Sequence, residues 1–210
     1  LNPLQDNANY FAIRAAYYSW GYLIRKAIAC YLDIDTSELD IGYHISVKTG
    51  NPEVFIVEKL ENGSGYCNYL SGRKYAQVPT EALLQPLLKG GAIYDTLCTP
   101  DHMRNCISSC YDCIRDYSNQ QYHMILDWRL GLDLSRMAAA KELFVNFDVE
   151  YWKDFMDNNL DSLLKKKKQH SQIKFGHYFA VNDSGVIKGI IVHPFWSDDY
   201  LSLIHISEPT

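Results

Sequence analysis

The sequence predicts an α+β fold of mixed helices and short antiparallel strands, and three patterns support this prediction. Residues 10–32 carry apolar side chains at helical spacing among good helix formers. Residues 41–47 and 54–60 are β-rich runs, and the turn signal Thr49–Pro52 between them is typical of a hairpin. A second hairpin is expected over residues 174–193, where another turn signal separates two β-rich runs. Helices and hairpins in separate stretches of chain are typical of α+β proteins.

Three further helices are expected. Residues 80–89 have a helical pattern that Pro86 should kink or stop. An apolar stripe runs as far as Met137 after Ser118, so a helix capped by Ser118 is expected there. The last helix is expected over residues 149–168, because the four lysines at its end suit the negative pole of a helix.

The composition is that of an ordinary globular protein. The 210 residues are 47% hydrophobic and 21% charged, so disorder of the whole chain is not expected. The net charge of −5 provides no long-range attraction to nucleic acid. No apolar run reaches the roughly 18 residues that span a bilayer, so no membrane partner is expected.

The chain is expected to contain two parts and an artefact. Residues 1–140 should form one domain, and residues 141–200 a tail made of a helix and a β-hairpin. Residues 201–210 resemble the translated read-through of a sequencing adapter and are left out of the fold prediction. The first residue is Leu1 rather than methionine, which indicates that upstream sequence is missing.

Four of the six cysteines lie within sixteen residues of one another: Cys98, Cys106, Cys110 and Cys113. Such clustering favours a metal site in a reducing compartment over a disulfide framework, so a cytoplasmic location is expected. Soft thiolates select zinc, and four of them leave no coordination position open for a substrate. The sequence therefore predicts a structural four-cysteine zinc loop and no catalytic residue.

Four alternatives to this metal site stay open. His102 lies between the first two cysteines and could replace one of them. Cys67 follows a glycine-rich turn that could approach the loop. An iron–sulfur cluster is the alternative cofactor, and a redox-active pair of Cys110 and Cys113 is the alternative use of the thiols. Cys30, on an apolar helix, is expected to be a small core residue.

Other polar segments give weaker signals. The run Lys165, Lys166, Lys167 and Lys168 could contact a nucleic-acid backbone, although a solvated helix end is favoured. Asp127, Arg129 and Asp133 could form a partner surface, although a solvated helix face with Trp128 in the core is favoured.

Two more features have an ordinary structural interpretation. The glycine-rich turn Glu61–Cys67 lacks the Lys-Ser/Thr pair of a phosphate-binding loop, which favours a simple strand-to-helix turn. His177 and His193 are expected on opposite strands of the last hairpin as structural histidines.

Three segments together resemble the MrfA-like zinc-binding (MZB) domain, which occurs at the C-terminus of DEAD/DEAH-type superfamily 2 helicases and in some phage-defence proteins. They are Asp35–Leu39 with its following strand, Val57–Cys67, and Cys98–Asp133. The resemblance covers about residues 10–135.

The resemblance implies a non-catalytic C-terminal module of an ATP-dependent helicase acting on nucleic acid, with zinc held by Cys98, Cys106, Cys110 and Cys113. Two RecA-like ATPase domains would lie upstream in the same chain or in a partner subunit, and the module would brace them and help to guide DNA. The ATPase motifs themselves are not in this sequence. The alternative is a non-enzymatic zinc-containing subunit of a phage-defence or DNA-repair complex, and a stand-alone metalloenzyme is the least favoured function.

Overall fold

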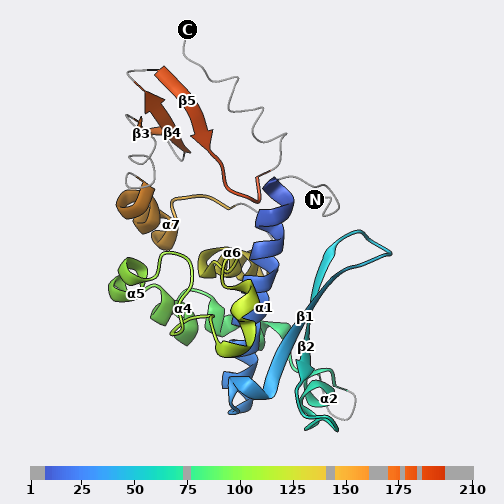
Figure 1. Ribbon diagram of the computed structural model, residues 1–210. Helices are drawn as coiled ribbons and strands as arrows, with labels where there is room; N and C mark the ends of the chain where they lie inside the picture. The colour runs from blue at the N-terminus through green and yellow to red at the C-terminus, as the bar shows by residue number, and fades with distance from the viewer. Residues whose placement is uncertain are drawn as a thin grey trace. The chain divides into compact units, whose positions relative to one another are not determined.

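The computed structural model describes residues 8–72, 77–140, 145–160, 170–175, 178–183 and 186–196 (Figure 1). The chain divides into two compact units, Leu1–Leu143 and Phe144–Thr210. Helices combine with short antiparallel strands, which confirms the predicted α+β class.

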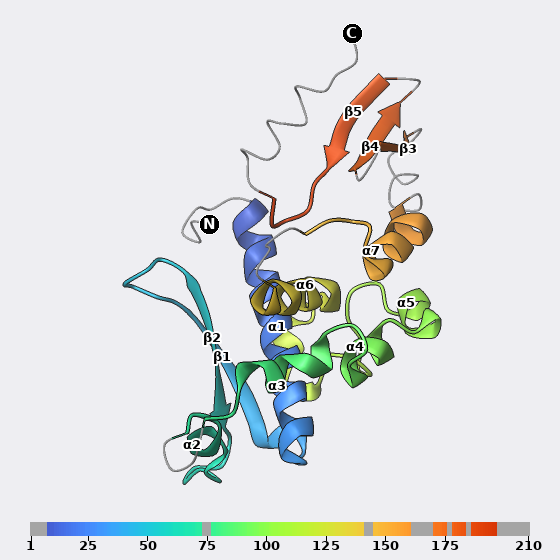
Figure 2. The same cartoon turned by 180° about the vertical axis from the view of Figure 1, so that it is seen from behind.

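Helix α1 (Ala8–Leu32) confirms the helix predicted over residues 10–32, and it is the central element of the first unit. The β1–β2 hairpin and helix α6 both pack against it (Figure 2). The hairpin can approach closely because α1 has no side chain at Gly21, where a Cβ would lie 2.8 Å from Ile41 Cδ1 and 2.9 Å from Val54 Cγ1. The helix ends at Leu32, and the residue that follows, Asp33, has a positive φ of 55°.

Strands β1 (Leu39–Ile45) and β2 (Pro52–Glu58) form the predicted antiparallel hairpin, each beginning two residues earlier than expected. A short 3-10 helix, η1 (Thr36–Glu38), precedes β1. The N–H of its Ser37 donates to the Asp35 carboxylate over 2.7 Å. Strand β2 alternates inward and outward side chains, which is the pattern of a strand with one packed face.

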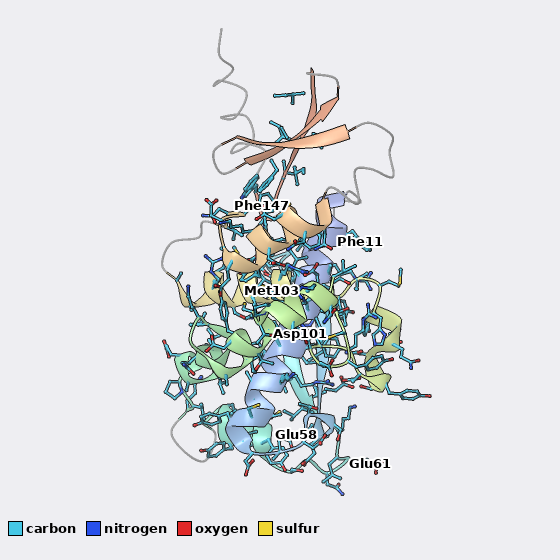
Figure 3. The ribbon with its side chains drawn as sticks, turned by 90° about the vertical axis from the view of Figure 1, so that its left-hand side faces the viewer. Phe11, Glu58, Glu61, Asp101, Met103 and Phe147 are labelled. Carbon is cyan, nitrogen blue, oxygen red and sulfur yellow. The ribbon has the colours of Figure 1, made fainter. Side chains whose placement is uncertain are left out.

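The glycine-rich turn leads from β2 into the short helix α2 (Tyr66–Leu70), as a strand-to-helix turn should. Gly65 takes a φ of 90°, which favours glycine. Glu58 is labelled near the lower end of the view in Figure 3. Its carboxylate accepts the backbone N–H groups of Ser64, Gly65 and Cys67, the last two over 2.8 Å. These amides already hold a carboxylate of the chain itself, which excludes them as a phosphate cradle in this conformation.

Four short helical segments lead towards the cysteines: α3 (Thr80–Leu84), η2 (Gln85–Leu87), α4 (Ala92–Leu97) and α5 (Pro100–Asn105). Pro86 ends α3 early, as predicted. Helix α5 starts with Pro100 at its first position, and the Thr99 hydroxyl caps it by accepting the His102 N–H.

The prediction of a single helix after Ser118 is wrong, because two separate helical elements occupy this part of the chain. The first is the 3-10 helix η3 (Tyr117–Tyr122), which Asp116 and Asn119 begin with a reciprocal capping box. The second is α6 (Trp128–Ala139), whose cap is Asp127. Each aspartate satisfies the first N–H groups of its own helix, so the chain restarts instead of continuing.

The second unit contains α7 (Glu150–Phe155), a π-helical turn η4 (Met156–Leu160), and three strands, β3 (His170–Phe175), β4 (Tyr178–Asp183) and β5 (Val186–Ile191). The strands form an antiparallel sheet in the order β3-β4-β5. The predicted hairpin corresponds to β4 and β5, and β3 was not predicted. The core of this unit is aromatic and comprises Phe147, Tyr151, Trp152, Phe179 and Trp196.

Candidate metal centre

Four potential metal ligands come together in the first unit: His102, Cys106, Cys110 and Cys113. Their ligand atoms all lie within 4.8 Å of one another, and this is the one such group among the residues that the structure describes. His102 belongs to α5, and the cysteines follow it in the loop that leads to η3. A single short segment therefore supplies all four ligands.

The separations that join Cys106 to Cys113, Cys113 to Cys110, and Cys110 to His102 match the edges of a tetrahedral zinc site. Zinc–sulfur bonds of about 2.3 Å give tetrahedral edges of about 3.8 Å between sulfurs, and slightly shorter edges to a nitrogen. The Sγ atoms of Cys106 and Cys113 are 3.8 Å apart, and those of Cys110 and Cys113 are 3.5 Å apart. His102 Nε2 lies 3.5 Å from Cys110 Sγ. One ion of this size fits among the four atoms.

The His102 ring is oriented for ligation. Its Nδ1 lies 2.8 Å from the carbonyl oxygen of Leu97, which can only accept, so Nδ1 carries the proton. The lone pair of Nε2 then faces the thiols. A carbonyl partner on the outer nitrogen is the usual support of a metal-bound histidine. The Trp128 ring packs edge-on against the imidazole, with ring centres 5.2 Å apart, and fixes its plane.

The three thiols shift one another's pKa values. The hydrogen bond from Cys106 lowers the pKa of Cys113 to about 4, and the Cys110 N–H, 2.9 Å from Cys113 Sγ, supports this thiolate. The same hydrogen bond, followed by burial, raises the pKa of Cys106. Burial and the neighbouring Cys113 charge raise the pKa of Cys110. Three thiolates in so small a space repel one another, and a divalent ion would remove that repulsion.

The pKa of His102 is also set by two opposing effects. Burial alone would lower the pKa of His102, but its hydrogen bonds to Cys113 and to the Leu97 carbonyl raise it. A metal ion at Nε2 would take the place of that proton.

Helix α6 holds the backbone at Cys106 through buried polar groups. The Arg129 guanidinium donates to the carbonyls of Ile107 at 2.6 Å and Cys106 at 3.3 Å. The Trp128 backbone N–H donates to the Ser108 carbonyl at 3.0 Å. The prediction that Arg129 and Asp133 lie on a solvated helix face is wrong, because both side chains are fully buried. Trp128 lies in the core, as predicted. Loop carbonyls accept from both terminal nitrogens of the arginine, and this makes its burial tolerable.

Helix α1 holds the other end of the segment that carries the candidate ligands, residues 102–113, which we call the metal loop. Lys26 Nζ donates to the carbonyls of Asp112 at 3.1 Å and Cys113 at 3.3 Å. The buried Arg25 guanidinium forms an ion pair with Asp116, the residue that caps η3. The loop is thus fastened to α6, which follows it closely in the sequence, and to α1, whose Lys26 precedes its acceptor Asp112 by 86 residues.

The structure brings together three of the four expected cysteines. Cys98 is the C-cap of α4 and is not part of the ligand group; His102 stands in its place. The spacing of four residues between His102 and Cys106 was the available signal, since a turn of helix brings such residues to one side. The Cys106 N–H indeed donates to the His102 carbonyl at 2.8 Å.

The remaining candidates lie elsewhere. The Cys67 thiol donates to the Ile56 carbonyl at 3.6 Å beside the hairpin, outside the ligand group. Cys30 is exposed on α1, so its predicted core position is wrong. His193 is buried among aromatic rings and accepts the Phe195 N–H at Nδ1 over 3.2 Å. His177 and the run Lys165, Lys166, Lys167 and Lys168 lie outside the described residues.

Comparison with protein-family models, with curated proteins and with solved structures gives no match to this chain. The resemblance to the MrfA-like zinc-binding domain therefore stays a prediction from the sequence. Among the described residues, no helix combines the length and the apolar character that crossing a bilayer requires.

Proposed function

We propose that this chain is a non-catalytic zinc-binding module in which one structural zinc ion fastens the cysteine loop to α1 and α6. The observation that carries the proposal is the group of His102, Cys106, Cys110 and Cys113, whose ligand atoms all lie within 4.8 Å of one another. Four protein ligands leave no position for a reacting water, so the ion serves folding rather than hydrolysis.

The wider function that we propose is the C-terminal module of an ATP-dependent DEAD/DEAH-type helicase in the cytoplasm. Its support is the sequence resemblance, whose segments fall on η1, on the turn from β2 to α2, and on the metal loop with α6. In this role the module braces ATPase domains of the same chain or of a partner subunit and helps to guide DNA. A reducing cytoplasm keeps the three thiolates available for zinc.

Metal analysis tests the structural part of the proposal. The protein purified with its metal should contain about one equivalent of zinc, and Cys113→Ser should abolish zinc binding and folded protein together. Cys98→Ser is the matched control and should retain the zinc, because Cys98 lies outside the ligand group. A well-folded, metal-free Cys113→Ser protein would refute the structural role.

The gene itself tests the helicase assignment. Walker-type motifs in the same reading frame upstream of Leu1 would support it. A complete gene without them would support instead a non-enzymatic subunit of a defence or repair complex.

A further inference from the structure

We propose that the metal centre, if it holds zinc as proposed above, is also a peroxide-sensitive switch, in which Cys110 and Cys113 form a disulfide and release the ion. Nothing in the proposed bracing function requires such sensitivity. It follows from the exposure and the spacing of the ligand thiols.

The three ligand cysteines differ in accessibility. Cys106 and Cys113 expose only 2% and 6% of their surface, whereas Cys110 is half-buried. The rate at which peroxide oxidises a cysteine depends on its thiolate character and on its accessibility. Zinc would hold all three ligand cysteines as thiolates, so accessibility distinguishes them. Cys110 is therefore the ligand that a small oxidant reaches first.

Cys113 is placed to complete the reaction. Its Sγ lies 3.5 Å from that of Cys110, closer than the 3.8 Å that separates it from Cys106. A disulfide requires about 2.05 Å, so the two sulfurs need to approach by about 1.5 Å. Only two residues separate them in a turn closed by the Cys113 N–H and the Cys110 carbonyl, 3.2 Å apart.

The chemistry balances with hydrogen peroxide as the oxidant. The Cys110 thiolate attacks one peroxide oxygen, the O–O bond breaks, hydroxide leaves, and the thiolate becomes a sulfenic acid. The Cys113 thiolate then attacks that sulfur, the S–O bond breaks, and a second hydroxide leaves. In total, two thiolates lose two electrons to one peroxide, giving one disulfide and two hydroxide ions.

The disulfide would undo the metal loop. Only His102 and Cys106 remain as ligands, too few to hold a structural zinc ion. The peptide that bends to form the disulfide includes the Asp112 and Cys113 carbonyls, which accept the hydrogen bonds from Lys26. Oxidation therefore releases both the ion and one of the attachments of the loop to α1. A dithiol reductant together with zinc should restore both.

The test uses the zinc-loaded 210-residue chain, hydrogen peroxide and a zinc-sensitive dye. We expect release of the bound zinc together with a Cys110–Cys113 disulfide in peptides mapped by mass spectrometry. Dithiothreitol followed by zinc should reverse the release. A disulfide to Cys98 or Cys106 in place of Cys113, or zinc retained while Cys30 is oxidised, would overturn the switch.

Two variants sharpen the test. Cys110→His keeps four ligands but removes the accessible sulfur, so zinc release by peroxide should become about tenfold slower or more. Cys98→Ser should release zinc at the rate of the unaltered chain, and an equal slowing in both variants would count against the switch. If Cys110→His binds no zinc, the disulfide map of the unaltered chain decides alone. A chain purified without zinc would refute the proposed function, whereas a zinc-loaded chain that peroxide leaves intact would refute only the switch.

Discussion

Replacing Arg129 with methionine should weaken the metal loop without touching any ligand. Arg129 is fully buried, and its guanidinium donates to the Cys106 and Ile107 carbonyls and lies 3.6 Å from the Asp127 carboxylate. Methionine fills part of the same space but leaves two carbonyls without this donor. Each unsatisfied buried group costs about 1–3 kcal/mol, so the loss of the donor to two carbonyls should lower the free energy of unfolding by about 2–6 kcal/mol.

Zinc affinity should fall with stability, because the Cys106 backbone loses its attachment to α6. Loss of an outer partner of a metal site typically lowers affinity by about 10–100-fold. Urea unfolding with zinc present measures the free energy of unfolding. Competition with a zinc chelator of known affinity measures the zinc affinity. Arg104→Met is the matched control on α5, where the exposed arginine should change stability by no more than about 0.5 kcal/mol. Equal losses in both variants would refute the reasoning.

Three further predictions concern other contacts. The Gly131→Ala variant should lose about 1–3 kcal/mol of unfolding free energy, because the added Cβ would lie 2.7 Å from Leu23 Cδ1. Gly189→Ala is the control, since its Cβ would meet nothing within 4 Å, and urea titration compares the two variants. Burial raises the pKa of Asp116, but hydrogen bonds from Ser118 and Arg25 lower it overall. The ionised carboxylate therefore stabilises the fold above the ordinary pKa of 3.8, and this stabilisation is lost as the pH falls below that value. Asp116→Asn should remove this part of the acid sensitivity of the urea midpoint. Chelation by EDTA should abolish the near-ultraviolet circular dichroism of the first unit, which zinc but not magnesium should restore.

The sequence was sufficient to predict the parts of the site that depend on neighbouring residues. Three of the four candidate ligands, Cys106, Cys110 and Cys113, were evident from the cysteine spacing. The fourth depended on the turn between α4 and α5, where Thr99 and Pro100 start a new helix and direct His102 rather than Cys98 to the thiols. The four-residue spacing of His102 and Cys106 favoured the histidine, but cysteine and histidine are both ordinary zinc ligands, so residue type did not choose between them.

The parts that depend on distant residues could not be predicted in the same way. The break before α6 is stabilised by the Ser19 hydroxyl, which accepts the Asp127 N–H over 2.8 Å from 108 residues away. The burial of Arg129 was also missed, because a charged residue is normally expected at the surface. Only the folded position of the Cys106 and Ile107 carbonyls supplies the acceptors that permit it.

The attachment of the metal loop to α1 has a consequence for the order of assembly. Arg25 and Lys26 meet partners 91 and 86 residues further along the chain, so these contacts have a high contact order. During synthesis α1 emerges first and must wait for the loop to be translated before its buried arginine finds a counter-charge. An excised peptide spanning residues 92–140 would hold every ligand and capture zinc, yet it would lack the helix against which the loop docks.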